Sequence, residues 1–307
     1  MKYYFIVNPN AGKKQGLKLI ESQIEALSEA AKEGNEFITY LTKAPGHATE
    51  LVKEIISDAA GEEIVIFACG GDGTCFEVLN GIVPHQNVRM GILPVGSCND
   101  FLKSFPEYDF ANLENLINAS YVITDVIKVN DEYCLNVANF GFDARTNDDQ
   151  LKLRYKFKNV KTAYNVALAK NILSPLGDKV LIKANNQTFF EGKSLLFACA
   201  NAQFYGGGYK CAPHADLTDG LIDLVVVKKI SVLKFIRLVK YYKQGIHLDD
   251  PRFNEIVYFI QTPSIEINSE KELVAAFDGE TRNDTHYEIS ILNKALKFVV
   301  PKESKYE

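Results

Sequence analysis

Three glycine-containing segments in the first hundred residues have the composition of phosphate-binding loops. The most distinctive is Gly70-Gly71-Asp72-Gly73-Thr74, which stands between an apolar run and a helical pattern from Phe76 to Asn80. Glycines let backbone amides approach phosphate oxygens, and the N-terminus of a helix favours negative charge. The carboxylate of Asp72 would repel a phosphate. Its position in this loop therefore indicates a divalent cation between the carboxylate and the phosphate. A simple turn has a similar composition, but the position directly after an apolar run favours a nucleotide site.

The other two segments are weaker signals. Asn8-Pro9-Asn10-Ala11-Gly12-Lys13-Lys14 follows the first strand-like run and offers a glycine and two lysines, although it lacks the G-x-x-x-x-G-K-[ST] pattern of a Walker loop. Gly96-Ser97-Cys98-Asn99-Asp100-Phe101 follows another apolar run, and Ser97 is suited to cap a helix or to bond a phosphate. Three such loops at the same edge of one sheet together predict a nucleotide site.

Two acidic segments in the second half of the chain are further candidates. Asp216-Leu217-Thr218-Asp219-Gly220 offers two carboxylates and several carbonyls, which suits a hard cation such as Mg²⁺, although a turn has the same composition. Asp278-Gly279-Glu280, taken alone, reads as a hairpin turn before the strand-like run Tyr287–Leu292. Its occurrence together with the glycine loop upstream makes its carboxylates candidates for accepting a proton.

Alternating strand-like and helix-like patterns surround the glycine loops. The strand-like runs are Tyr3–Val7, Glu36–Leu41, Ile64–Cys69 and Val88–Leu93, and the helix-like patterns are Leu17–Lys32 and Ala48–Ala60. Because Ile64–Cys69 is apolar throughout, it is typical of a strand buried on both faces of a parallel sheet. The alternation predicts a doubly wound α/β domain, whose ligands bind at the carboxyl ends of the strands. We expect four loop residues to converge there: Asn8, Thr42, Gly70 and Ser97.

After about Ser120 the pattern changes to short strands joined by turn signals, which predicts a mainly antiparallel β domain. Two helix-like insertions interrupt it, at about 148–173 and 230–244. We place the boundary near Lys128, so that residues 1–128 form the nucleotide-binding domain and residues 129–293 form the β domain. The last strand-like run, Leu296–Val300, could return to either domain, and residues 294–307 would belong to the first if it returns there. Since no Pro- or Ser-rich linker separates the halves, we expect a long shared interface that encloses a cleft.

The composition restricts the partners. With 34 basic and 39 acidic side chains the net charge is -5, so nothing in the overall charge favours nucleic acid. The six cysteines form no Cys-x-x-Cys pair, which suits a reducing compartment. The opening apolar run is too short for a secretory signal, and no run reaches the ~18 to 20 apolar residues of a membrane span. We therefore expect a cytoplasmic protein with peripheral contact at the inner face of the membrane. The sequence leaves a homodimer open.

Two segments are candidates for that membrane contact. In Ile230–Gln244 the apolar side chains at 232, 235, 236, 239 and 242 share one helical face, and Lys234, Arg237 and Lys240 lie on the other. Such a helix suits an anionic membrane, and equally suits packing on the core of the protein itself. A second basic run has a weaker apolar stripe: Lys152, Arg154, Lys156, Lys158 and Lys161.

Six segments together resemble a known family. They are FIVNPNAGKKQG at 5–16, GGDGTCFEVLNG at 70–81, GILPVGSCNDF at 91–101, NFGFDA at 139–144, APHADLTDGLID at 212–223 and FDGE at 277–280. Their order and spacing resemble those of the soluble bacterial lipid kinases, which are similar to the catalytic domain of diacylglycerol and sphingosine kinases. The resemblance covers nearly the whole chain. It implies a fold like that of NAD kinase, with a C-terminal β-sandwich, and phosphorylation of a lipid hydroxyl by ATP and Mg²⁺ in the cleft.

The same resemblance implies roles for individual residues. Those expected at the nucleotide are Asn8, Pro9, Asn10, Lys13, Thr42, Gly70, Gly71, Asp72, Gly73, Thr74, Glu77, Ser97, Asn99 and Asp100. Asp72 would organise the catalytic Mg²⁺, and Glu280 is preferred to Asp278 as the general base. A structural Mg²⁺ would be held by the carbonyls of Asp216 and Leu221 and the carboxylate of Asp219, with Asp125 linked to it through water.

The sequence departs from the family pattern at two places and leaves alternatives open. Ser97-Cys98 stands where threonine and a small residue are usual, and Leu102-Lys103 also differs, which leaves the lipid preference open. NAD kinases and phosphofructokinases also carry Gly-Gly-Asp-Gly loops, but the Asn-Glu pair and threonine-rich glycine loop of NAD kinases are absent. The acceptor could be diacylglycerol, a sphingoid base or phosphatidylglycerol. A lipid- or nucleotide-binding regulator without catalysis is the alternative from another class.

Overall fold

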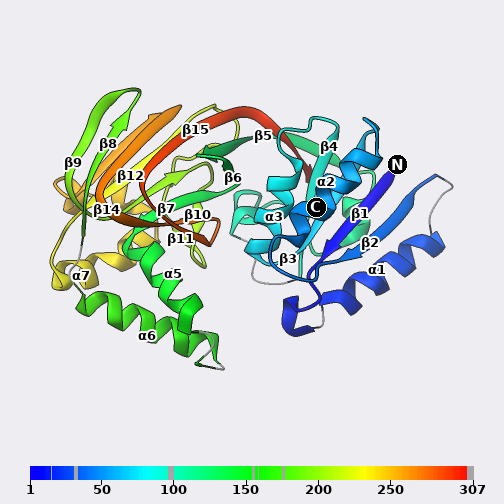
Figure 1. The fold of residues 1–307 in the computed structure, drawn as a ribbon, viewed down its shortest axis with the longest axis horizontal. Helices are drawn as coiled ribbons and strands as arrows, with labels where there is room; N and C mark the ends of the chain where they lie inside the picture. The colour runs from blue at the N-terminus through cyan, green and yellow to red at the C-terminus, as the bar shows by residue number, and fades with distance from the viewer. Residues whose placement is uncertain are drawn as a thin grey trace. The chain divides into compact units, whose positions relative to one another are not determined.

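The computed structural model describes residues 1–14, 16–30, 34–95, 100–153, 156–157, 159–174 and 177–302. The chain forms two compact units (Figure 1). Unit 1 consists of Met1–Val126 together with Asn293–Glu307, and unit 2 consists of Ile127–Leu292. Unit 1 is therefore discontinuous in sequence, because its last segment follows the whole of unit 2.

A parallel sheet forms the centre of unit 1. Its strands are β1 (Lys2–Val7), β2 (Glu36–Leu41), β3 (Ile64–Gly70), β4 (Val88–Pro94) and the end of β15 (Glu280–Val300), in the order β15-β4-β3-β1-β2. The register pairs Ile6 with both Tyr40 and Ala68. Every residue of β3 is buried, as its apolar sequence predicts. The doubly wound fold expected from the alternation is confirmed.

The helices of unit 1 connect these strands. They are η1 (Ala11–Lys14), α1 (Gly16–Ala30), α2 (His47–Asp58), α3 (Asp72–Ile82), η2 (Phe101–Ser104) and α4 (Leu113–Leu116). The chain order reverses in the sheet, since β2 and β3 lie on opposite sides of β1, so right-handed connections place α1 and α2 on opposite faces. α2 packs on α3, and α1 packs on α4. α3 begins at Asp72, four residues before the pattern that the sequence shows.

Unit 2 is mainly antiparallel. Its strands are β5 (Ser120–Val129, which begins in unit 1), β6 (Glu132–Cys134), β7 (Val137–Gly141), β8 (Asp178–Ala184), β9 (Gln187–Ala200), β10 (Phe204–Tyr205), β11 (Tyr209–Lys210), β12 (Ile222–Lys228), β13 (Val257–Thr262), β14 (Ser264–Phe277) and the first part of β15. Four strands form a closed ring, because β9 pairs with β7 and β8, and β14 pairs with the same two. All four of these pairings are antiparallel, as the sequence predicts.

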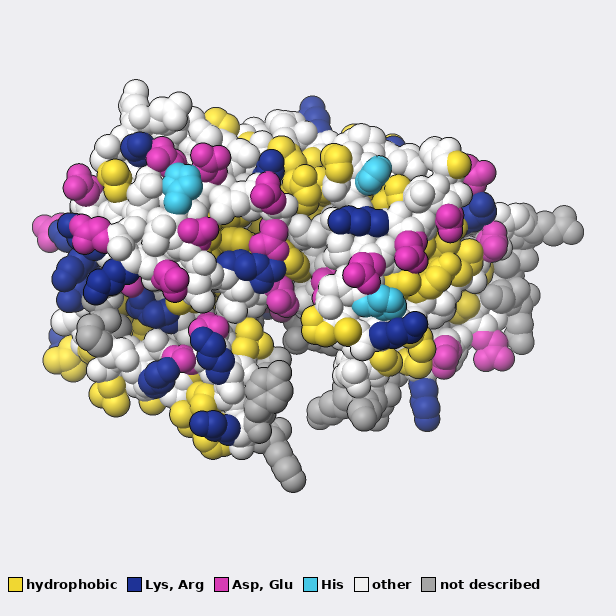
Figure 2. All heavy atoms as spheres, in the orientation of Figure 1, with side chains coloured by type: hydrophobic (Ala, Val, Ile, Leu, Met, Phe, Trp, Pro, Cys, Tyr) yellow, Lys and Arg dark blue, Asp and Glu magenta, His cyan; other side chains and the backbone are white. Residues whose placement is uncertain are grey.

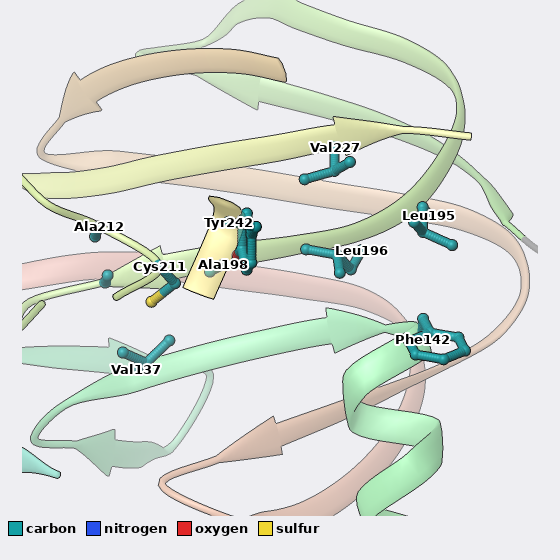
Figure 3. Packing of buried hydrophobic residues seen from close by; sticks show 10 residues of the cluster. Val137, Phe142, Leu195, Leu196, Ala198, Cys211, Ala212, Val227 and Tyr242 are labelled. Carbon is teal, nitrogen blue, oxygen red and sulfur yellow. The ribbon is translucent and has the colours of Figure 1, made fainter. Parts of the chain in front are cut away.

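Three α-helices lie on this unit: α5 (Phe142–Leu153), α6 (Val160–Leu173) and α7 (Val232–Lys243), followed by the short η3 (Ile246–Leu248) and η4 (Pro251–Phe253). The helix-like insertion expected at about 148–173 is present as two helices, and the first begins earlier than expected, directly after Gly141, where φ is +84°. Figure 3 shows the buried cluster beneath them, in which Tyr242 of α7 lies near Ala198 and Cys211.

The end of the chain is one long strand. The sequence shows two runs, Tyr287–Leu292 and Leu296–Val300, but β15 extends from Glu280 to Val300. Lys294, with φ of +54°, lies between the two runs within the strand. After it, Lys297 pairs with Arg89 of β4, and the ring of Phe298 stacks on Phe105 and meets Phe101 edge-on.

Candidate active site

The loop after β1 turns sharply at the carboxyl edge of the parallel sheet. The N–H of Asn8 donates to the carbonyl of Cys69 at the end of β3, and the side-chain oxygen of Asn8 accepts from the N–H of Asn10 at 2.9 Å. Pro9 lies between them, half-buried, and Lys13 follows in η1. These contacts hold the first loop against the second, as a site at the carboxyl ends of β1 and β3 requires.

The second loop runs directly into a helix. Gly71 is the N-cap residue of α3 and, as a glycine, has no side chain to cap the helix, and Asp72 is exposed in the first turn. The backbone of this loop does not adopt positive φ angles at its glycines, Gly70, Gly71 and Gly73. The loop therefore does not need glycine for its backbone conformation. Gly70 is required for another reason: a Cβ atom would stand 2.2 Å from the side-chain oxygen of Thr74. Close packing of the loop on α3 therefore leaves the helix N-terminus open to an anion.

Thr42 and Glu77 are held by different neighbours. The N–H of Thr42 donates to the carbonyl of Val7, which places Thr42 at the same sheet edge as Asn8. The two carboxylate oxygens of Glu77 accept from the N–H of Gly46 at 2.7 Å and of Ala48 at 3.0 Å. Glu77 therefore serves as the cap of α2, which gives it a structural role beside the loops.

The third loop is only partly described. Ser97 and Asn99 lie outside the described residues. The preceding residue Val95 packs on the first loop, since a Cβ atom at Gly12 would stand 2.2 Å from the Val95 carbonyl oxygen. Asp100 accepts a hydrogen bond at 2.5 Å from the ammonium group of Lys103. The structure thus brings the described loop residues of unit 1 to one sheet edge, as the alternation predicts.

In unit 2 the Asp278-Gly279 pair forms the turn between β14 and β15. Phe277 pairs with Glu280, and φ is +46° at Asp278 and +96° at Gly279, which is the geometry of a two-residue type I′ hairpin. The turn expected from composition is present. It places Asp278 inside the loop and Glu280 as the first residue of β15.

The carboxylate of Asp278 is fully engaged by the segment between β6 and β7. One oxygen accepts from the thiol of Cys134 and from the N–H groups of Asn136 and Val137, and the other accepts from the N–H of Leu135 at 2.6 Å. Burial raises the pKa of Asp278, while these four hydrogen bonds act in the opposite direction. Burial also raises the pKa of the Cys134 thiol well above its ordinary value, so the thiol stays protonated and donates.

Glu280 stands beside a fixed ion pair. Arg282, two residues along the same face of β15, donates to both oxygens of Glu132, at 2.8 and 2.6 Å. Glu280 is half-buried, and its charge adds to the rise in the pKa of Arg282 that the hydrogen bond with Glu132 causes. The side chain of Asn147 in α5 donates to the carbonyl of Gly279, which fixes the turn from its other side. The hairpin therefore presents Glu280 on a rigid base.

The acidic loop before β12 contains two carboxylates, and a third lies at the start of β12 itself. Asp216 accepts from the N–H and hydroxyl of Thr218, and Asp219 accepts from the N–H of Leu221 at 2.9 Å. Asp223, which the sequence interpretation missed, is 2% exposed, and neither of its oxygens has a hydrogen-bond partner of good geometry among the described residues. Burial raises its pKa to about 6; the Gln261 side chain lowers it, whereas Asp219 raises it further.

These residues fit a hard cation. A buried carboxylate without hydrogen-bond donors is costly unless a positive charge compensates it. Within the described part of the chain no three His, Cys, Asp or Glu side chains are arranged as a complete metal site, so backbone carbonyls such as those expected of Asp216 and Leu221 would have to complete it. Asp125, buried in unit 1, accepts from the N–H of Lys294 at 2.6 Å. Its expected link to the cation stays a prediction.

A second buried carboxylate was also missed. Asp143 accepts a very short hydrogen bond from the hydroxyl of Tyr205, and burial raises its pKa to about 6. Both residues stand out in the sequence as acidic residues among apolar ones. Asp143 follows an apolar strand, in NFGFDA, and Asp223 lies within an apolar run, in GLIDLVVV. An acidic residue inside an apolar run is worth marking as a buried charge even when no motif assigns it a role.

Two family models match this chain: the diacylglycerol kinase catalytic domain over residues 2–129, and the YegS C-terminal NAD kinase beta sandwich-like domain over residues 136–300. The chain belongs to the diacylglycerol kinase family. The diacylglycerol kinase of Bacillus subtilis (strain 168) is 29% identical over 303 residues, which cover 97% of this chain and 96% of that protein. The one from Staphylococcus carnosus (strain TM300) is 27% identical over 305 residues, covering 98% and 95%.

Solved structures agree with this family assignment. A Bacillus anthracis (strain Sterne) protein, provisionally described as a diacylglycerol kinase, superposes with a TM-score of 0.72 at 25% identity, over 97% of this chain and 96% of that chain. Yeast NADH kinase complexed with NADH, at 12% identity, has a TM-score of 0.52 over 98% of this chain and 84% of that one and shares the fold alone. The expected NAD-kinase-like fold and lipid kinase family are confirmed, and the protein is a kinase.

Proposed function

We propose that this family member transfers the γ-phosphoryl group of ATP to the hydroxyl of diacylglycerol and so forms phosphatidic acid. The names of its relatives support the acceptor. The geometry of unit 1 supports the donor, because a glycine loop leads into the N-terminus of α3 at the carboxyl edge of a parallel sheet. That single feature carries the proposal: it is the part of the molecule that is suited to a triphosphate.

Different residues of the chain would bind the phosphates, the catalytic metal and the structural metal. The backbone of Gly70–Thr74 and the loop at Asn8–Lys13 would bind and orient the phosphates. Asp72, exposed at the first turn of α3, would hold the catalytic Mg²⁺, which neutralises phosphate charge when bound. The loop at Asp216–Leu221, with Asp223, would hold a structural Mg²⁺.

Glu280 is the better candidate for the general base. An alcohol becomes a good nucleophile only as its proton leaves, so the base needs a carboxylate lone pair directed at the acceptor. The oxygens of Asp278 already accept four hydrogen bonds from 134–137, which suits an anchor of the turn. Glu280 follows that anchor on the rigid hairpin and would take the proton.

The decisive experiment is transfer of labelled phosphate from ATP to a panel of lipids in mixed micelles. The panel holds diacylglycerol, a sphingoid base and phosphatidylglycerol, and we expect diacylglycerol to be labelled fastest. Asp72→Asn and Glu280→Gln should each lower turnover at least ~100-fold. The exposed carboxylates Asp58 and Glu255 give matched controls, D58N and E255Q, which should keep full activity.

Three outcomes would contradict the proposal. Preferential labelling of another lipid would move the assignment to that acceptor. Unchanged turnover in D72N would remove the role of Asp72 at the nucleotide. Absence of transfer to any lipid by the folded wild-type protein would favour a regulator that binds lipid or nucleotide without catalysis.

A further inference from the structure

The segment from Lys228 to Lys243 is strongly basic. It carries six basic side chains and no acidic one, in a chain whose net charge is -5. Most of it forms α7, which begins after Ser231, where the serine hydroxyl accepts from the N–H of Lys234. A local excess of this size in an acidic protein sets this helix apart from the rest of the surface.

The inner face of α7 packs on the core of unit 2. Leu238 and Tyr242 are buried, and the ring of Phe235 meets Phe142 of α5 edge-on, with centroids 5.2 Å apart. Val232 and Phe235 contact the buried cluster of Figure 3. Of the two interpretations of this segment, packing on the core therefore holds for these residues.

The outer face of α7 has a different composition from the one expected. Ile236, assigned by its spacing to the packed face, is 56% exposed, and Leu233 is 69% exposed. Lys234, Arg237 and Lys240 surround them and are also exposed. We call these five side chains the α7 outer face. It joins two apolar groups to three cations on one side of a helix.

A further exposed apolar side chain lies at the end of α6. Leu173, the last residue of α6, is 87% exposed, which is the largest value among the exposed large hydrophobic residues of the described chain. The chain that leaves α6 passes the segment between β12 and α7, since a Cβ atom at Gly177 would stand 3.2 Å from the side chain of Lys229. Figure 2 shows hydrophobic and basic side chains gathered over α6 and α7, at the lower left.

A bilayer with anionic lipids matches this surface. Exposed leucine and isoleucine gain free energy on entering an apolar layer, while the surrounding lysines and arginine keep their charges at the headgroups. Negative headgroups attract each cation. A second copy of the chain matches poorly, because two such faces would bring like charges together. None of the helices in the described part of the chain has the length and apolar content that crossing a bilayer requires, so contact through these helices would be along the surface.

We propose that the α7 outer face, together with Leu173, docks this protein on an anionic lipid surface. The proposal rests on the proposed function, because a lipid acceptor lies in a bilayer and the enzyme has to reach it there. Leu233, Ile236 and Leu173 would enter the headgroup region, and the basic side chains would pair with phosphates.

Co-sedimentation of the full chain with vesicles tests the charges. Vesicles of phosphatidylglycerol and phosphatidylcholine in equal amounts should bind the wild type, and pure phosphatidylcholine vesicles should bind it weakly. The triple variant K234E/R237E/K240E should partition at least ~100-fold less, since each basic residue near an anionic surface contributes about fivefold. The variant K18E/K53E/K271E changes the net charge equally at exposed positions on other elements and should bind like the wild type.

A second variant tests the apolar contribution. The variant L233S/I236S should partition onto the vesicles at least ~10-fold less than the wild type. This loss should persist at high salt, where the electrostatic attraction is screened. Equal binding of K234E/R237E/K240E and wild type overturns the proposal. So does an equal loss in the control variant, or failure of the wild type to bind any vesicle. Capture of an acidic protein by this face, without vesicle binding, would assign it to a protein partner instead.

Activity in detergent micelles separates this proposal from the proposed function. A dispersed short-chain diacylglycerol reaches the enzyme without a bilayer, so both docking variants should keep wild-type turnover there. Loss of vesicle binding with full micelle activity supports the docking surface. If the wild type phosphorylates no diacylglycerol in micelles, the proposed function is wrong. The vesicle-binding result would still test the docking surface independently.

Discussion

At the residue scale the two carboxylates of the hairpin, Asp278 and Glu280, have separable tasks. Asp278 is an acceptor for three backbone N–H groups and the Cys134 thiol, so it ties β14 and β15 to the segment before β7. Glu280 is the first residue of β15 and stands beside the ion pair of Arg282 with Glu132. Sequence spacing alone cannot distinguish these roles, because both residues lie in one three-residue motif.

Asparagine at 278 should therefore cost stability as well as activity. Its amide offers one acceptor oxygen where the carboxylate offers two, and its NH₂ group would face a backbone donor. We expect Asp278→Asn to lower the free energy of unfolding by about 1–3 kcal/mol. Glu280→Gln should leave it within about 0.5 kcal/mol of wild type while abolishing turnover. Urea unfolding of both variants checks this, and equal stability of the two would contradict it.

Asp143 should make stability depend on pH. Its pKa is about 6 in the folded protein against an ordinary 3.8, so the native state holds the proton more tightly than the unfolded chain does. The free energy of unfolding should fall as pH rises from about 4 to about 6, by on the order of 1–3 kcal/mol, and this contribution is then constant. Urea unfolding of Asp143→Asn across this range should lack that fall. A variant with the wild-type pH dependence would rule the effect out.

Asp223 should make stability depend on Mg²⁺. Since its buried carboxylate has no hydrogen-bond partner of good geometry among the described residues, a bound cation should stabilise the native state. Saturating Mg²⁺ should raise the melting temperature of the metal-stripped wild type by about 5 °C. Asp223→Asn should lose most of that rise, whereas the exposed control Asp131→Asn should keep it. Equal Mg²⁺ responses in both variants would exclude Asp223 from the site.

At the element scale the loops are held by their contacts with one another. Gly12 combines a φ of +57° with a close approach to the carbonyl of Val95, so the first loop is packed on the start of the third. The sequence showed a glycine in a loop and predicted contact with phosphate. The structural reason for glycine at this position is its packing on Val95, 83 residues further along the chain, which spacing along the chain cannot reveal.

Gly12→Ala should therefore disturb the nucleotide site. The added methyl group would force the two loops apart, and we expect the affinity for a non-hydrolysable ATP analogue to fall at least ~10-fold. Gly61→Ala is the matched control, because Gly61 also has a positive φ of +91° but a Cβ atom there meets nothing within 4 Å. Calorimetric titration compares them. Equal affinities would show that loop packing does not position the nucleotide.

The elements themselves were largely predictable where a hydrophobic period is strong. The strands β1 to β4 lie within one residue of their predicted runs, and β3 is the clearest case, since burial on both faces leaves a continuous apolar pattern. α3 and α5 begin earlier than their patterns because their first turns carry polar site residues such as Asp72 and Asp143. The cap formed by Glu77 and the buried Asp223 depend on contacts between distant segments, which no local pattern encodes.

At the scale of the whole molecule, unit 1 depends on the last strand of the chain. The end of β15 pairs with β4, and Phe298, fully buried, packs against the rings of Phe101, Phe105 and Phe110. Without this strand β4 would be an unpaired sheet edge beside uncovered aromatic rings. Unit 2, by contrast, is one continuous stretch of sequence.

Fragments that correspond to the two units should differ in whether they fold alone. A chain of residues 127–292 should unfold cooperatively, whereas residues 1–126 alone should lack a cooperative transition. Joining residues 293–302 to the shorter fragment through a Gly/Ser linker should restore one, because the missing strand is then supplied. Calorimetry and near-ultraviolet circular dichroism report the outcome. Cooperative unfolding of residues 1–126 without the added strand would contradict the dependence.

The discontinuity of unit 1 also determines the order of events at the ribosome. The segment that emerges first lacks its closing strand until residues 293–300 have been synthesised, so the domain that is begun first is completed after unit 2. Until then its aromatic rings stay uncovered, while residues 127–292 are already able to fold. Termination before residue 293 therefore leaves a product whose nucleotide half is a target for chaperones and proteases.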